Sequence, residues 1–260
     1  MKVVLTIAGS DSGGGAGIQA DIKSGFYHGI FMTTAITAIT VQNTLGVTNV
    51  EVLKPSFVQE QISSVLEDFK VNAIKIGMLG SKELILKVLD CIKPLYIPII
   101  LDPVAISRAG SKLIDDEAVE TLKTLFKYAF VITPNKYEAK LFFDVNSIDD
   151  IKNIKHIPTN ILFKNMVEDK NKTVDVLLKK DGTIINFESK RADESNTHGT
   201  GCSFSASIAS LVAKGETLED SIKIAKKYIY EAIKHAPNLG NGNGPINHIL
   251  NYKSRNKALF

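Results

Sequence analysis

The chain has 260 residues, which is long for one domain but within the reach of a single α/β domain. Hydrophobic residues make up 44% of the chain, so a sizeable core can form and a disordered chain is excluded. The formal net charge is +3 and the charges are spread along the chain, so the composition gives no case for a nucleic-acid partner.

No stretch of the sequence approaches the ~18 apolar residues of a membrane span. The apolar run at residues 3–8 is shorter than the ~7–15 apolar residues in the h-region of a signal peptide and predicts a buried first strand instead. The two cysteines, Cys91 and Cys202, match neither a disulfide framework nor the spacing of a metal site. We therefore expect no membrane partner and a cytoplasmic location.

Short apolar runs alternate with longer amphipathic segments along the chain. The runs predict strands at residues 3–8, 33–41, 73–78, 97–102, 129–133 and 161–164. The amphipathic segments predict helices at 17–28, 56–69, 81–92, 115–127, 135–143, 203–214 and 217–235. Residues 172–188 contain a Lys-Asp-Gly turn between two strand-like runs and predict an edge hairpin. This order predicts one α/β domain over residues 1–260, with a mostly parallel sheet covered on both faces.

Polar and glycine residues follow the predicted strands directly. GSDSGGGAG follows the first strand and VQN ends the second, while GML, DPV, TPNKYE and KNM follow the next four. Ligands of such sheets bind beyond the carboxyl ends of the strands, so we expect one site along this edge.

The glycine-rich loop at residues 9–21 could wrap a ligand or a phosphate with its amides. It matches neither a Walker A loop nor a dinucleotide fingerprint, and a plain strand-to-helix turn is an alternative. Asp21 is either a carboxylate of the first helical turn or a residue that holds a polar group of a substrate.

Two residues after later strands are candidates for holding a flat ring. Gln42 can donate and accept hydrogen bonds together, which suits an aminopyrimidine edge, although a surface glutamine is an alternative. Met78 can form an apolar wall for a ring or belong to the core.

The stretch TPNKYE predicts a helix start. Asn135 is a plausible N-cap with Glu138 at the third helical position, as in a capping box. Alternatively, Asn135 and Glu138 organise Mg²⁺ and its waters beside nucleotide phosphates, and Asp102 could add its carboxylate to the same site.

The stretch NTHGTGC predicts an anion site at the start of a helix. Gly199, Thr200 and Gly201 should leave backbone amides that stabilise a phosphoryl group in transit. The same field should lower the pKa of Cys202, whose thiolate could take the proton from an attacking hydroxyl. His198 is interpreted as a residue that positions the loop.

These motifs together resemble the ribokinase-like superfamily, and within it the hydroxymethylpyrimidine/phosphomethylpyrimidine kinase family. The resemblance runs from TIAGSDSGGGAGIQAD through VQNTLGV, KIGML, DPV, TPNKYEA and THGTGC to GPINHI. It implies a ribokinase-like three-layer α/β/α sandwich and a homodimer. It also implies ATP- and Mg²⁺-dependent phosphorylation of the hydroxymethyl group of 4-amino-5-hydroxymethyl-2-methylpyrimidine and then of its monophosphate, in thiamine biosynthesis or salvage.

The resemblance also assigns roles to single residues. Those expected around the pyrimidine are Gln42, Asp21, Gly9, Ala16, Met78 and Val104. Those expected to contact nucleotide or phosphate are Asn135, Lys164 and Thr197, with Glu138 and Asp102 at the metal. Cys202 stands where sugar kinases of the superfamily have a catalytic aspartate.

The chain departs from the family pattern after Lys164, where Asn165 and Met166 replace two glycines. Since Met166 cannot adopt a positive φ cheaply, we expect a disturbed backbone contact with phosphate there. The segment between Glu138 and Lys164 is also shorter than usual. Two other functions compete: a pyridoxal/pyridoxine kinase, and a non-catalytic pyrimidine-binding protein, which rests on the Asn165–Met166 replacement alone.

Overall fold

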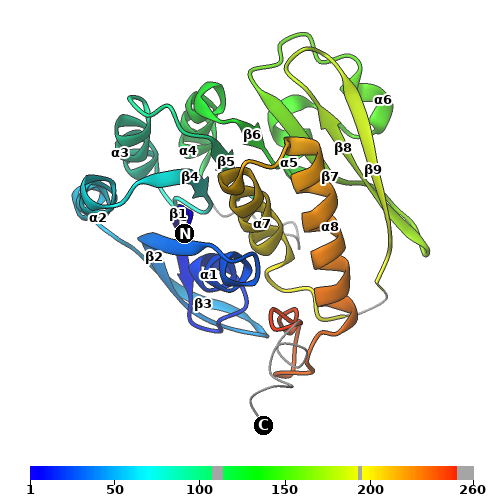
Figure 1. The fold of residues 1–260 in the computed structure, drawn as a ribbon, viewed down its shortest axis with the longest axis horizontal. Helices are drawn as coiled ribbons and strands as arrows, with labels where there is room; N and C mark the ends of the chain where they lie inside the picture. Colours follow the sequence, from blue (N-terminus) through cyan, green and yellow to red (C-terminus); the bar gives the residue numbers. More distant parts are fainter. Residues whose placement is uncertain (107–113, 193–194, 251–260) are drawn as a thin grey trace.

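A computed structural model describes residues 1–106, 114–192 and 195–250, and it contains one nine-stranded sheet (Figure 1). The strand order is β3-β2-β1-β4-β5-β6-β7-β8-β9. The central parallel strands are β2 (Phe31–Asn43), β1 (Val3–Asp11), β4 (Val71–Ile76), β5 (Ile99–Leu101), β6 (Val131–Ile132) and β7 (Asn160–Glu168). Antiparallel pairing adds β3 (Gly46–Val52) at one edge, and β8 (Lys172–Leu178) and β9 (Ile184–Lys190) at the other.

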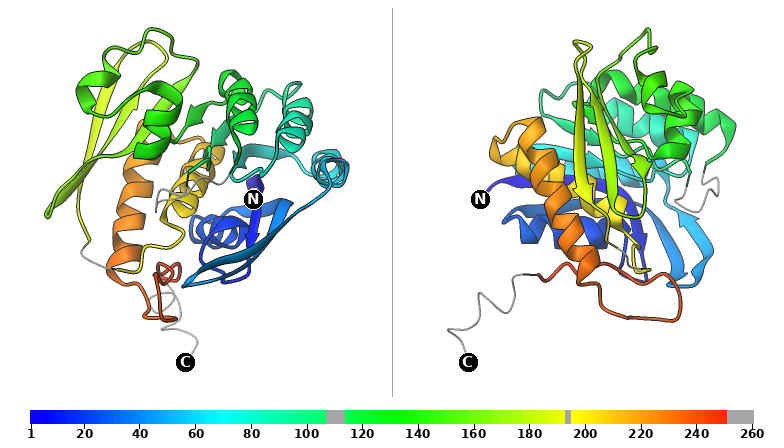
Figure 2. Two further views of the ribbon diagram at one scale, coloured as in Figure 1. Left: turned by 180° about the vertical axis from the view of Figure 1, so that it is seen from behind. Right: turned by 90° about the vertical axis from the view of Figure 1, so that its right-hand side faces the viewer.

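Helices cover both faces of the sheet (Figures 1 and 2). One face carries α1 (Gly17–Tyr27), α7 (Thr200–Lys214) and α8 (Leu218–Lys234). The other carries α2 (Pro55–Asp68), α3 (Lys82–Ile92), α4 (Asp116–Leu122), the 3₁₀ helix η1 (Lys123–Tyr128), α5 (Lys136–Phe143) and the short α6 (Ile148–Ile151).

The two faces are built by alternation along the strands. Val4 packs with the residues of α7 and α8, whereas its neighbour Leu5 packs with those of α2 and α3. Ala73 and Ile74 divide in the same way, because successive side chains of a strand point to opposite faces. The result is the three-layer α/β/α sandwich of ribokinase-like proteins, with the edge hairpin formed by β8 and β9.

The sequence missed one strand of this sheet. Every residue of β3 is exposed. Its sequence therefore shows neither the apolar run typical of a buried strand nor the regular alternation typical of a half-buried one. The predicted helix at 115–127 is divided between α4 and η1, and the four-residue α6 was not predicted. Within the described part of the chain, no helix is both long and apolar enough to cross a membrane.

Two buried histidines make stability depend on pH. Burial lowers the pKa of His28 and of His248 to about 4 in each case. His28 packs edge-on against the rings of Tyr27 and Tyr228, and Ser203 Oγ lies 2.9 Å from His248 Nε2. An unfolded histidine titrates near 6.5, so the unfolded chain binds more protons than the folded chain between pH 6.5 and about 4. Stability should therefore fall as the pH falls through this window.

We expect the free energy of unfolding in urea to be lower at pH 5 than at pH 7 by on the order of 1–2 kcal/mol for each of these histidines. His28→Phe keeps an aromatic ring and should remove its share of the pH dependence. His235→Phe, at an exposed position, serves as the control. An unchanged pH dependence in the His28 variant would contradict the prediction.

Candidate functional site

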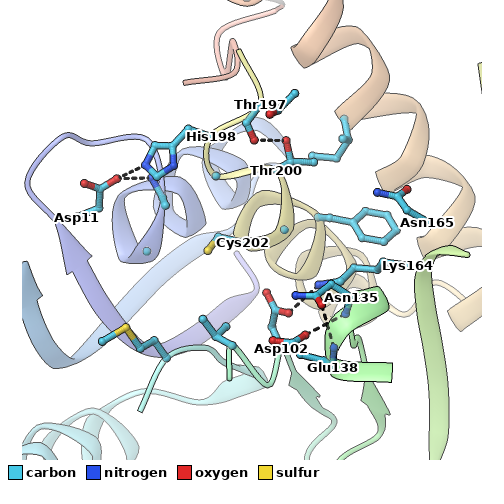
Figure 3. A pocket seen from close by; sticks show the side chains of 18 of the residues that line it. Asp11, Asp102, Asn135, Glu138, Lys164, Asn165, Thr197, His198, Thr200 and Cys202 are labelled. Carbon is cyan, nitrogen blue, oxygen red and sulfur yellow. Dashed lines mark hydrogen bonds and ion pairs between the residues drawn. The ribbon is translucent and has the colours of Figure 1, made fainter. Parts of the chain in front are cut away.

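A cavity of ≈ 700 Å³ lies along the carboxyl ends of the central strands, above the start of α7 (Figure 3). Fourteen of the fifteen residues expected at the site line it: Gly9, Ala16, Gln42, Met78, Asp102, Val104, Asn135, Glu138, Lys164, Thr197, Gly199, Thr200, Gly201 and Cys202. The cavity continues between β8, β9 and α8. Figure 3 shows Cys202 between a pair formed by Asp11 and His198 and the group around Lys164.

Asp21 is the one predicted residue outside this lining. It is fully buried, and its carboxylate lies 2.9 Å from Lys75 Nζ and accepts a 2.6 Å hydrogen bond from Thr6 Oγ1. It also lies beyond the first turn of α1, so both sequence interpretations of Asp21 differ from the structure. The geometry assigns it another part: it holds Lys75, a fully buried lysine that does line the cavity.

The turn before α7 leaves backbone amides free, as predicted, but not the expected set. Gly199 is the N-cap with a φ of 81°, and a Cβ on it would overlap the carbonyl oxygen of Gly15. The N–H of Thr200 already donates to Thr197 O at 3.2 Å. In the described part of the chain nothing accepts from the N–H groups of Gly201 and Cys202. These two amides lie at the positive end of a 15-residue helix and are free to bind an anion.

The prediction of a lowered pKa for Cys202 is wrong. Burial raises the pKa of this thiol to about 11, and the nearby carboxylates of Asp21 and Asp102 act in the same direction. The Lys75 ammonium and the N–H of Gly17 oppose the rise without cancelling it. The thiol is half-buried at the wall of the cavity beside the charged groups of Lys75, Asp21 and Asp102, and desolvation there outweighs the helix field.

Lys164 brings a positive charge to the free amides. Its Nζ lies 2.8 Å from Asp102 Oδ1, which also accepts from Thr133 Oγ1 at 3.2 Å. A Cβ on Gly201 would lie 3.7 Å from Lys164 Nζ, so the ammonium is beside the first turn of α7. Burial acts to raise the pKa of Asp102, but Lys164 outweighs it and the pKa stays below its usual value. Both groups are therefore charged, and an anion at these amides meets a lysine held in place.

The capping box at the start of α5 is confirmed. Asn135 Oδ1 accepts from the N–H of Tyr137 at 2.9 Å and of Glu138 at 3.0 Å, and Glu138 Oε2 accepts from the N–H of Asn135 at 2.9 Å. Glu138 Oε1 also accepts from the N–H of Ala105 at 2.9 Å. Burial, with a contribution from Asp102, raises the pKa of Glu138 to about 7 against the opposing effect of Lys164. Asn135 and Glu138 also line the cavity, so their capping role is compatible with a role at the site.

The pair Asp102 and Glu138 fits a magnesium ion that is shared with phosphates. The described residues contain no group of three or more His, Cys, Asp or Glu that could hold a metal ion alone. Mg²⁺ commonly takes one or two carboxylates, several waters and phosphate oxygens. A divalent cation here would relieve the repulsion from Asp102 that helps to raise the pKa of Glu138.

The loop after Lys164 forms differently from the expectation. Asn165 takes the positive φ, 52°, and Met166 has no positive φ. Asparagine tolerates this conformation better than other residues that carry a Cβ. Asp175 Oδ1 accepts from the N–H of Asn165 at 2.8 Å, and Asp175 Oδ2 pairs with Lys226 at 2.6 Å. The positive φ therefore lies at Asn165 rather than at Met166, and a side chain from β8 supports it. The disturbed backbone contact with phosphate stays a prediction.

We expect Asn165→Gly to leave the KM for ATP within about twofold of wild type, because glycine adopts this φ freely. Asn165→Val should raise that KM several-fold, since a β-branched residue resists a positive φ at a cost of about 1–2 kcal/mol. Steady-state kinetics at varied ATP concentration measure both. Equal KM values in the two variants would show that the bend does not matter for the nucleotide.

The sequence left three residues of the cavity without a role or with only a minor one. Asp11 accepts from the N–H groups of Gly13, Gly15 and Ala16 at 2.8–3.0 Å and so closes the glycine-rich loop. The signal for it is an aspartate, a common turn-forming residue, two positions before the run of three glycines at residues 13–15. Lys75 stands between isoleucines in a buried strand, where a charge needs a partner. His198 contacts Asp11, and no local sequence pattern indicates that contact.

Known proteins resemble this chain over almost its whole length. The family model described as phosphomethylpyrimidine kinase matches residues 11–247. A hydroxymethylpyrimidine/phosphomethylpyrimidine kinase of Haemophilus influenzae is 42% identical over 95% of this chain and 97% of its own length. A thiamine biosynthesis bifunctional protein of Geobacter sulfurreducens is 40% identical over 95% of this chain and 52% of its own length. The solved ADP complex of Bacillus subtilis pyridoxal kinase is 30% identical, with a TM-score of 0.87 over 96% of this chain and 98% of that one.

Proposed function

This chain belongs to the phosphomethylpyrimidine kinase family, and we propose that it transfers the γ-phosphoryl group of ATP to the hydroxymethyl group of 4-amino-5-hydroxymethyl-2-methylpyrimidine, then phosphorylates the monophosphate. Its place is in thiamine biosynthesis or salvage. One observation carries the proposal: a single cavity joins Gln42 to Lys164 and passes Cys202 and the free amides on the way. A ring at Gln42 can thus present a hydroxyl to a phosphate at the start of α7.

The chemical step needs few groups. The hydroxymethyl oxygen attacks the γ-phosphorus, and the bond between that phosphorus and the ADP oxygen breaks. The hydroxyl proton passes to Cys202 in its thiolate form, which a pKa of about 11 keeps to a small fraction of the enzyme near pH 7. The N–H groups of Gly201 and Cys202 stabilise the charge on the transferred group, together with the Lys164 ammonium.

ATP is the proposed phosphoryl donor, and the related pyridoxal kinase was solved as an ADP complex. Mg²⁺, when bound, would neutralise charge on the phosphate oxygens. Asp102 and Glu138 are the proposed holders of the ion, since both carboxylates are nearly fully buried and line the cavity beside Lys164. Asn135 and Thr197 also line the cavity and are proposed to contact the nucleotide.

A coupled assay of ADP release tests the function. We expect Mg²⁺-dependent turnover with the hydroxymethylpyrimidine and with its monophosphate, and weaker turnover with pyridoxal. Faster turnover with pyridoxal would favour the second candidate, pyridoxal kinase, which the likeness to the Bacillus subtilis structure supports. Gln42 favours the pyrimidine, because its amide matches a donor–acceptor edge.

A non-catalytic pyrimidine-binding protein would bind the ring in calorimetry without forming ADP. Its only support was the replacement of two glycines by Asn165 and Met166. The positive φ of Asn165 and its hydrogen bond to Asp175 supply an ordered bend at this position. We therefore favour the enzyme over the binding protein.

We also propose that two copies associate, as the family resemblance implies. The hairpin of β2 and β3 exposes a row of apolar side chains, with Val41, Leu45 and Val47 exposed at 58%, 73% and 48%. Sedimentation velocity should give the mass of a dimer for wild type and of a monomer for Val47→Glu. We place the protein in the cytoplasm, since its two cysteines are both free.

A further inference from the structure

Three side chains meet at the end of the cavity where the ring is proposed to bind. Asp11 Oδ2 lies 2.8 Å from His198 Nε2, and the amide of Gln42 lies 3.2 Å from the same ring nitrogen (Figure 3 shows the first pair). A Cβ on Gly15 would overlap the imidazole, and Pro245 flanks the same spot. The imidazole is therefore held in one place by contacts from three separate segments of the chain.

The contact with Asp11 decides which nitrogen of His198 carries the proton. Asp11 is 3% exposed, and its oxygens accept three backbone N–H groups. Burial acts to raise its pKa, but the hydrogen bonds from His198 and from the backbone outweigh burial, so the carboxyl is ionised. A carboxylate oxygen 2.8 Å from a ring nitrogen requires a proton between them, and that proton belongs to Nε2.

The proton on Nε2 has a consequence for Gln42. The amide nitrogen Nε2 of Gln42 lies 3.2 Å from the ring nitrogen Nε2 of His198, so an N–H group of one side chain faces an N–H group of the other. The amide oxygen Oε1 of Gln42 lies 3.1 Å from Thr40 Oγ1. The single hydroxyl proton of Thr40 has a second acceptor, Ser10 O at 3.0 Å. A half-turn of the amide removes this conflict, because its oxygen then shares the single Nε2 proton of His198 with Asp11 and its NH₂ group donates to Thr40.

The geometry points to His198 as a positioning residue: held by Asp11, it fixes the amide of Gln42 with the oxygen on the His198 side and the NH₂ group on the Thr40 side. Each amide atom keeps the capacity for one more hydrogen bond. The free edge of Gln42 therefore offers an acceptor and a donor in a set order.

That order selects one orientation of the substrate, and here the inference rests on the proposed function. An aminopyrimidine edge pairs its amino group with the Gln42 oxygen and its ring nitrogen with the Gln42 NH₂ group. In this substrate the hydroxymethyl carbon adjoins the amino-bearing carbon on the side away from that nitrogen. The hydroxymethyl group therefore lies on the His198 side, toward the turn that carries Cys202 four residues later. The reverse amide would send it to the Thr40 side, away from the phosphate.

The protonation can be tested on the protein alone. Long-range ¹⁵N–¹H correlation spectra at pH 7.5 should show a proton on His198 Nε2, and His198→Gln identifies the signals by their loss. A ring without a proton on Nε2 would overturn the inference. This readout needs neither substrate nor turnover, so it stands even if the proposed function fails.

The orientation is tested with two substrates, the aminopyrimidine and its analogue without the 4-amino group. His198→Leu should lower kcat/KM for the aminopyrimidine about tenfold or more, because the amide is free to turn. For the analogue the loss of kcat/KM should stay within about threefold, because the analogue has no amino group to pair with the Gln42 oxygen. His198→Gln, which keeps an N–H near the Nε2 position, should recover most of the difference. The matched control His235→Leu should leave kcat/KM unchanged for both substrates. Equal losses for both substrates would assign His198 a purely structural part and overturn the inference.

Discussion

Replacing Cys202 by alanine should lower kcat by about 10²–10⁴-fold, the usual contribution of a general base. The dissociation constant of the pyrimidine should change by less than about threefold, because the ring is held by other side chains of the cavity and alanine leaves the amides of the first helical turn in place. Stopped-flow or steady-state ADP release gives kcat, and calorimetry gives the binding constant. Cys91→Ala, at the other free cysteine, on α3, is the control and should keep wild-type turnover.

The pH profile separates the base from the amides. With a thiol pKa of about 11, the thiolate fraction of Cys202 grows about tenfold per pH unit below that value. If the thiolate takes the proton, kcat/KM of the wild type should rise with pH above neutrality, and Cys202→Ala should lose this rise. Near-normal turnover in the alanine variant would remove Cys202 as the base and leave the phosphate cradle to Gly201, Lys164 and the backbone of residue 202.

Gly199→Ala should lower kcat at least about 10²-fold, which is the effect of losing one amide donor to a developing negative charge. Two causes act together. Alanine at a φ of 81° costs about 1–2 kcal/mol, and its Cβ would overlap the carbonyl group of Gly15. The turn must therefore shift, and the N–H groups of Gly201 and Cys202 shift with it. The assay is ADP release at saturating pyrimidine and ATP.

The opposite end of the same helix provides the control for this variant. Gly215 caps α7 at a φ of 98°, and a Cβ there would meet no atom within 4 Å. Gly215→Ala should lower the melting temperature in the same direction as Gly199→Ala while keeping kcat within about twofold of wild type. If both variants lose turnover alike, general destabilisation rather than amide placement explains the loss.

Local sequence patterns were sufficient for most of the architecture, with β3 and α6 as the exceptions. The run at residues 3–8 and the segment 203–214 were placed correctly, because burial on a sheet or on one side of a helix imposes a period that adjacent residues display. Strand ends in a parallel sheet meet at one edge, so the motifs that follow them, from Gln42 to Lys164, could be grouped into one site. The capping box of Asn135 and Glu138 was likewise readable, because it depends on residues three apart.

Properties that depend on distant partners could not be read in this way. The pKa of Cys202 is set by burial and by charges from β4 and α1, far from it in the chain, and this reversed the expectation drawn from its helix. Asp21 pairs with Lys75, 54 residues away in sequence, because α1 packs on the sheet that contains Lys75. His198 meets Asp11 across 187 residues. Electrostatic energies depend on spatial separation and desolvation, which the order of residues along a chain does not contain.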